Sequence, residues 1–142
     1  DPAAGRHPEL GGHGGARQAA EALMIPAHRV IKTLVMTSDE QSLLLVLMHG
    51  DRTVSTRQLA RSIGSKTVRP IPHEKTERCT GYRVGGISPF GTRKAMRVYV
   101  QQTVLDATSI FINGGKRGFL LEIKPKVLPA TLGAIAVDCM QQ

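Results

Sequence analysis

The run VIKTLVMTSDEQSLLLVLM, residues 30–48, decides the fold. It holds two apolar segments, 30–36 and 42–48, each rich in branched and long side chains, and the polar residues 37–39 stand between them. Two such segments joined by turn-forming residues are typical of adjacent antiparallel strands. We therefore predict a β-hairpin at this point of the chain.

Helices and strands are predicted in irregular order on both sides of the hairpin. Upstream, apolar residues at helical spacing predict an amphipathic helix over 16–24 that ends before Pro26. Downstream, Ser55 and Gln58 form a capping-box pattern, and Gly64 is suited to close that helix in the left-handed conformation. The other predicted elements are a strand over 67–71, a helix from Pro72 to Thr80, strands over 96–100, 109–112 and 119–123, and a short helix from Pro125 to about Leu132.

This order of elements differs from a repeating βαβ pattern and predicts the α+β class. The strands are too short and too few for two packed sheets, so we expect one strongly curved, barrel-like sheet, mixed and largely antiparallel, flanked by helices. A length of 142 residues suits a single hydrophobic core. We expect residues 1–15, rich in Gly, His and Pro, to form a flexible or irregular arm, and residues 16–142 to form the domain.

The charge balance indicates a polyanionic partner. The chain has 19 basic and 11 acidic residues, a net charge of +8, and a pI near 10.1. RNA is the leading candidate, but a solvated basic surface explains the charge equally well. Aromatic residues make up only 4% of the chain, without Trp, so an RNA contact would rest on phosphates and shape more than on stacked bases.

Other features restrict the class of protein. The longest apolar run, 43–48, is too short to cross a bilayer, so no membrane partner is expected. Cys79 and Cys139 have neither metal-ligand spacing nor a disulfide pattern, which fits a reducing cytoplasm. The five histidines are scattered without a paired ligand motif. We therefore expect neither a metal nor another cofactor.

Two glycine-rich segments stand out. We call residues 81–91 the glycine loop and residues 113–118 the glycine turn. The glycine loop combines four glycines and Pro89 with apolar residues, which indicates a defined backbone rather than a floppy one. Its amides could bind a carbonyl oxygen that gains negative charge, or the loop could be a purely structural turn. The glycine turn carries the same two interpretations.

These segments carry a family resemblance. The stretch TGYRVGGISPFG, residues 80–91, resembles the central signature of bacterial YbaK proteins. VIKTL, residues 30–34, resembles the lysine-bearing strand of that family, and NGGKRG, residues 113–118, resembles its Gly-Gly-Lys-Arg-Gly turn. Asn113 and Cys79 stand where Ser is usual. The resemblance spans most of the chain.

The resemblance implies a fold and an activity. The fold would be a curved mixed sheet related to the editing domain of bacterial prolyl-tRNA synthetases, and the activity would be trans-editing, the hydrolysis of misacylated tRNA. The glycine turn favours the YbaK subgroup, which implies Cys-tRNA(Pro) as substrate. Misacylated tRNA is then the expected partner, and stable binding of a prolyl-tRNA synthetase is left open.

Site residues follow from the resemblance residue by residue. Lys32 on an apolar strand would, from pattern alone, be a solvated edge lysine twice as often as a pocket residue, but the resemblance makes it the catalytic candidate that holds the ribose, phosphate or ester region. Lys116 and Arg117 are candidates for tRNA binding, or simply face solvent. The substrate-binding candidates are Tyr82, Gly85, Gly86, Ile87, Ser88, Pro89, Asn113, Gly114 and Gly115.

No protein nucleophile is recognisable, since no Ser lies in a G-x-S-x-G elbow. The ester would then be attacked by an oriented water or by a group on the substrate. The thiol of a cysteinyl group lies near its own carbonyl, and such proximity replaces a large part of a bimolecular barrier. Substrate-assisted cleavage is therefore preferred. The alternatives are a non-catalytic RNA-binding protein and a deacylase for Ser-, Ala- or Thr-charged tRNA.

Overall fold

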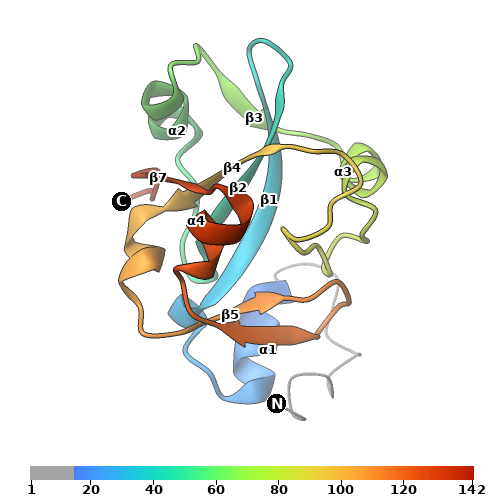
Figure 1. The fold of residues 1–142 in the computed structure, drawn as a ribbon, viewed down its shortest axis with the longest axis vertical. Coiled ribbons are helices and arrows are strands. Elements are labelled where there is room, and N and C mark those ends of the chain that lie inside the picture. Colours follow the sequence, from blue (N-terminus) through green and yellow to red (C-terminus); the bar gives the residue numbers. More distant parts are fainter. Residues whose placement is uncertain (1–14) are drawn as a thin grey trace.

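A computed structural model describes residues 15–142 of the chain (Figure 1). The predicted arm therefore lies outside the described residues, apart from Gly15. Gly15 is the first residue of helix α1, Gly15–Leu23. This helix confirms the amphipathic helix predicted from the spacing of apolar residues.

The predicted hairpin is present and forms the middle of the sheet. Strand β1, Val30–Ser38, pairs antiparallel with β2, Leu43–His49, in a register that runs from Ile31 opposite His49 to Thr37 opposite Leu43. Because alternate residues of a strand face opposite sides, Ile31 and Val35 pack into one hydrophobic cluster and Leu34 and Met36 into another. The hairpin thus has apolar contacts on both faces.

Seven strands of the described chain form one sheet, in the order β6-β5-β1-β2-β4-β7, with β3 also paired to β1. Three pairings are antiparallel, and three are parallel: β1 with β5, β2 with β4, and β4 with β7. The prediction of a single mixed domain flanked by helices is confirmed. The further elements are β3 Val68–Pro70, β4 Arg97–Gln101, β5 Ile110–Asn113, β6 Leu120–Ile123, β7 Ile135–Val137, α2 Thr56–Ile63, α3 His73–Thr80, α4 Val127–Leu132, and the 3-10 helices η1 Ala27–Arg29 and η2 Gln102–Asp106.

Local signals explain where α2 and α3 begin and end. The Ser55 hydroxyl accepts a hydrogen bond from the Gln58 amide at the start of α2, and Gly64 closes that helix with a φ of 75°. Pro72 precedes α3, and Gly81 ends it with a φ of 82°. Both glycines adopt the left-handed conformation that costs other residues free energy.

Strand β7 and the two 3-10 helices were not predicted. β7 has only three residues, and Ile135 and Ala136 are exposed. Its partner is β4, residues 97–101, which pairs with it in parallel. A strand this short is stabilised by a distant neighbour rather than by a pattern of its own, so sequence periodicity does not reveal it.

The edge of β1 opposite β2 is divided between two other strands. β5 pairs with residues 30–31 at one end, and β3 pairs with residues 36–38 at the other (Figure 1). Val30 and Ser38 direct their peptide groups toward the β2 side, because the Val30 carbonyl accepts from Gly50 and the Ser38 amide donates to Ser42. By alternation Thr33 directs its peptide groups to the opposite edge, where neither β5 nor β3 reaches it. The sheet therefore has a gap at the middle of β1.

Candidate functional site

A cavity of about 620 Å³ lies at this gap. Its walls come from β1, α1, the segment 50–53 after β2, the start of α3 and the glycine loop. Thr33, which is only 8% exposed, lines the cavity, and its hydroxyl has no hydrogen-bond partner among the described residues. A buried unpaired hydroxyl costs about 1–3 kcal/mol. The unpaired hydroxyl lies where neither β5 nor β3 pairs with the middle of β1.

Lys32 lies in the wall of this cavity, half-buried, on the face of β1 opposite Ile31. Burial lowers the pKa of Lys32 first, and the positive charge of Arg17 lowers it further, while Asp51 acts in the opposite direction. Both lowering effects disfavour the charged form. An anionic group that enters the cavity would therefore stabilise the charged form of Lys32 and would in turn be attracted by its ammonium group. Lys32 thus lies beside the open edge of β1 and, at the same time, in the wall of the cavity.

The glycine loop packs directly against the glycine turn. The Asn113 amide nitrogen donates to the Lys116 carbonyl at 2.9 Å and to the Gly85 carbonyl at 3.4 Å, and its oxygen accepts from the Gly115 amide at 2.7 Å. A Cβ on Gly86 would lie 2.7 Å from the backbone nitrogen of Arg117. Glycine at this position is thus required by close backbone approach.

The amides of the glycine loop differ in what they bind. The Val84 amide donates to the Glu77 carboxylate at 2.8 Å, and the Gly86 amide donates to the Arg83 carbonyl at 2.8 Å. Gly85 and Ile87 both line the cavity, and within residues 15–142 no acceptor is recorded for either amide. Donors without partners beside a ligand cavity can stabilise a developing oxyanion.

Other predicted residues support the loop from within. Ser88 is buried, and its hydroxyl accepts from the Phe90 amide at 3.1 Å. The Tyr82 hydroxyl donates to the Phe90 carbonyl, and Pro89 is buried beside Ser88. None of these three side chains lines the large cavity. Contact of these three side chains with substrate stays a prediction, and it would have to occur outside the large cavity.

A second hollow, of about 250 Å³, lies beside the glycine turn. It is lined by Tyr82, Gly114, Gly115, Lys116 and Phe119. The predicted site residues thus divide: Lys32, Gly85, Ile87 and Asn113 line the large cavity, and Tyr82, Gly114, Gly115 and Lys116 line the small one.

Arg117 has an intramolecular role that the sequence did not indicate. Its guanidinium donates to the Val84 carbonyl at 3.2 Å and lies against Gly85. Arg117 and Lys116 are both exposed, and the Lys116 side chain has no hydrogen bond among the described residues. Contact of either residue with tRNA stays a prediction.

Sequence reasoning missed Asp51 and Arg17, which line the same cavity. Asp51 follows Gly50 at the end of the second apolar segment, and Arg17 lies on the polar side of α1. Neither residue was singled out, because nothing in the local sequence pattern indicates that α1 and the end of β2 border one cavity.

The protein thiols are poor nucleophile candidates. Cys79 and Cys139 are free and buried, and neither lines the cavity. Burial raises the pKa of Cys79, and it raises the pKa of Cys139 to about 11. Because the thiolate is the reactive form, neither cysteine is poised for attack at neutral pH.

Over residues 15–142 there is no group of His, Cys, Asp and Glu side chains that could hold a metal ion. In the same part of the chain, no helix has the length and hydropathy needed to span a membrane. The cavity wall combines Lys32, residues of the glycine loop, the cationic side chains of Arg17 and Arg52, and the carboxylate of Asp51.

Comparison with known proteins identifies the class. Residues 14–130 match the family model described as the aminoacyl-tRNA editing domain. EbsC of Enterococcus faecalis, provisionally named a Cys-tRNA(Pro)/Cys-tRNA(Cys) deacylase, is 31% identical over 87% of this chain and 76% of its own length. A proline–tRNA ligase of Brachyspira hyodysenteriae is 26% identical over 61% of this chain, and the match takes up 15% of that enzyme.

A solved structure agrees in fold. The crystal structure of a protein provisionally described as a trans-editing enzyme for prolyl tRNA synthetase superimposes with a TM-score of 0.80. The two chains are 25% identical, and the match covers 89% of this chain and 80% of the other. The fold is that of a small α+β domain, and it is shared with this editing enzyme. The chain belongs to the aminoacyl-tRNA editing domain family, and it is an aminoacyl-tRNA deacylase.

Gly86→Ala tests the packing of the two glycine segments. The added methyl group would overlap backbone atoms at 2.7 Å, and overpacking of this kind costs about 1–3 kcal/mol. We expect a lower urea midpoint and a loss of deacylation larger than the loss of folded protein. Gly15→Ala is the control, because its methyl group would meet the Gly85 carbonyl of the same loop at an ordinary 3.6 Å. Equal behaviour of the two variants would contradict the packing assigned to Gly86.

Proposed function

We propose that this deacylase acts in trans on Cys-tRNA(Pro), and that Lys32 and the amides of the glycine loop hold the aminoacyl ester in the cavity at the gap in the sheet. The single observation that supports this most strongly is the position of Lys32, half-buried in the same cavity wall as Gly85 and Ile87, whose amides have no acceptor within residues 15–142. A charged anchor and oxyanion donors are what positioning of an ester requires.

Lys32 binds the ribose, phosphate or ester region by charge and hydrogen bonding. Its ammonium group is partly desolvated, and an ion pair formed away from water is stronger than one at the surface. Arg17 and Arg52 line the same cavity and add positive charge. The cavity therefore suits the 3′ end of a tRNA, where phosphate and ester lie close together.

The Gly85 and Ile87 amides orient the aminoacyl carbonyl. Negative charge develops on that oxygen when a nucleophile adds, and fixed amide dipoles stabilise it without rearrangement. The hydrogen bonds of Asn113 to both glycine segments hold the loop that carries these amides. The protein thus supplies binding, orientation and polarisation of the carbonyl.

The attacking group is the thiol of the substrate. The protein thiols are buried with raised pKa values, and no serine lines the cavity. The substrate sulfur attacks its own carbonyl carbon, and the C–O bond to the ribose breaks. The thiol gives its proton to water, and the ribose oxygen takes one from water. The cyclic thiolactone that leaves is then opened by water to free cysteine.

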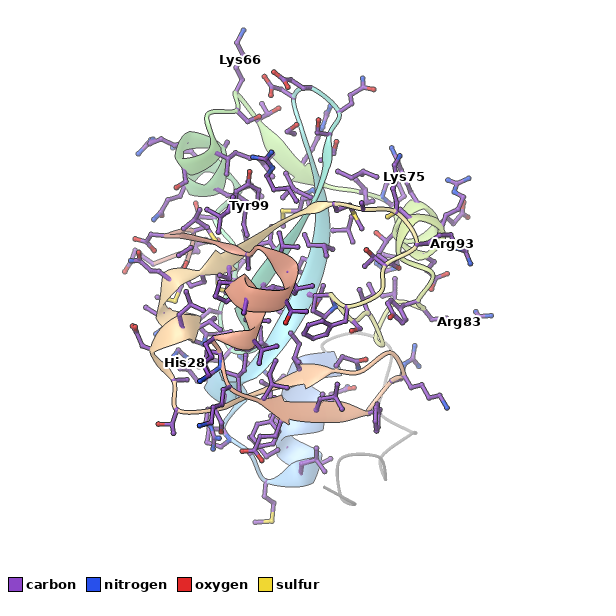
Figure 2. All side chains as sticks on the ribbon, viewed as in Figure 1. His28, Lys66, Lys75, Arg83, Arg93 and Tyr99 are labelled. Carbon is purple, nitrogen blue, oxygen red and sulfur yellow. The ribbon has the colours of Figure 1, made fainter. Side chains whose placement is uncertain are left out.

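The surface beside the site fits a polyanion. Lys75, Arg83 and Arg93 project outward from α3 and the segment that follows it (Figure 2). This side of the molecule adjoins the glycine loop, so phosphates of an acceptor stem would meet positive charge as the 3′ end enters the cavity. A prolyl-tRNA synthetase is the partner that would supply the misacylated tRNA, in keeping with the similarity to proline–tRNA ligases.

Lys32→Ala tests the assignment of the anchor. Loss of one preorganised electrostatic contact lowers turnover about 10²- to 10³-fold, and we expect such a loss in single-turnover deacylation of Cys-tRNA(Pro), with the thermal midpoint little changed. Lys66→Ala is the matched control, because Lys66 is exposed and far from the cavity at the tip beyond α2 (Figure 2). Turnover by Lys32→Ala close to that of Lys66→Ala would refute the role of Lys32.

S-methylation of the cysteinyl group tests the chemistry. If the substrate thiol attacks, S-methyl-Cys-tRNA(Pro) and Ser-tRNA(Pro) should bind but resist cleavage, because neither offers a thiolate. Cleavage of native Cys-tRNA(Pro) should rise with pH towards a thiol pKa of about 8.5. The measurement is the release of labelled amino acid at saturating protein. Equal rates for the native and the S-methylated substrate would assign the attack to an oriented water instead.

A further inference from the structure

Asp51 is the only carboxylate among the described residues that line the large cavity. The other ionic side chains in its wall, Arg17, Lys32 and Arg52, are cationic. Its own side chain is 33% exposed, so part of the carboxylate remains open at the cavity it lines. A single carboxylate among cationic side chains indicates a role other than that of an ordinary solvated surface residue.

A rigid support holds this carboxylate in place. Nδ1 of His28 lies 3.0 Å from Oδ1 and 3.3 Å from Oδ2 of Asp51, so the imidazole N–H donates to the carboxylate. The His28 ring stacks on the His49 ring with centroids 3.7 Å apart and planes 8° from parallel. Although burial acts to raise the pKa of Asp51, the hydrogen bond and the charge of His28 hold that pKa below its usual value.

His49 is itself fixed from behind. Its Nδ1 lies 2.7 Å from the His28 carbonyl, which can only accept, so Nδ1 carries the proton. Its Nε2 lies 2.7 Å from the Thr103 hydroxyl and accepts from it. Burial lowers the pKa of His49 and favours this neutral form. The carboxylate at the cavity is therefore supported by two ordered rings rather than by a mobile side chain.

The substrate class carries a group that needs such an anion. An aminoacyl ester has a free α-amino group, and a substantial part of that group is ammonium at neutral pH. Arg17, Lys32 and Arg52 favour the phosphate and ester of the same molecule but repel this ammonium group. Asp51 is the only anionic side chain in the described wall that can offset that repulsion.

We propose that Asp51, held by His28, binds the α-ammonium group of the aminoacyl ester and so selects tRNA charged with a free amino acid over tRNA whose amino acid is N-acylated. This inference rests on the proposed function, because it assigns a recognition residue to the same cavity. It gives the deacylase a way to spare N-acylated esters such as peptidyl-tRNA, whose amide nitrogen has no charge and an added substituent.

A binding experiment tests this inference separately from catalysis. The probes are two analogues of Cys-tRNA(Pro) in which an amide replaces the ester, one with a free α-amine and one with an N-acetyl group. We expect the unmodified protein to bind the free amine about 10- to 100-fold more tightly, the range for a hydrogen bond to a charged group. Asp51→Asn should lose most of this preference by weakening only the binding of the free amine.

The control variant is Asp106→Asn, which removes the same charge at an exposed position outside the cavity wall. It should keep the preference of the unmodified protein. Equal affinity of the unmodified protein for the two analogues, or an unchanged preference in Asp51→Asn, would overturn the assignment of Asp51. A protein that binds with the expected preference but releases no cysteine from Cys-tRNA(Pro) would contradict the proposed substrate or mechanism while leaving the role of Asp51 supported.

Discussion

The structure depends on the way in which one edge of β1 is shared. A strand edge carries peptide groups that must be paired, and here β5 takes one end and β3 takes the other. Neither reaches Thr33 between them, and the sheet opens at that point. Lys32 and Thr33 line the cavity at this gap, and the Thr33 hydroxyl has no hydrogen-bond partner within residues 15–142.

Two glycine segments, the glycine loop and the glycine turn, border the gap in β1. Gly86 allows the glycine loop to approach the backbone of the glycine turn, and Asn113 ties the two together. This packing holds the loop whose residues Gly85 and Ile87 line the same cavity as Lys32. Cationic side chains then suit the phosphate end of a substrate, and Asp51 suits its ammonium group. Under the proposed function, this arrangement would position an ester without a protein nucleophile, and the substrate would supply the attacking group.

The parts of the fold that were predictable are those with local signals. The hairpin followed from two apolar segments, and α2 followed from Ser55 and Gly64, whose hydrogen bond and left-handed conformation are both present. β7 was missed because it is held by β4. In the site, Lys32 and the glycine loop were found through a family resemblance. Asp51 was missed, because the cavity that it shares with α1 exists only in the folded chain. The inward contact of Arg117 with Val84 likewise depends on tertiary packing.

The central claim is that the aminoacyl end binds at the gap in β1. The most direct measurement is the change in backbone amide resonances of the ¹⁵N-labelled protein when the amide-linked analogue of Cys-tRNA(Pro) is added. We expect the largest shifts at Thr33, whose peptide groups face the gap, and at Gly85 and Ile87, which line the same cavity. Large shifts confined to the small hollow at Lys116 and Phe119, with Thr33 and Gly85 unmoved, would contradict it.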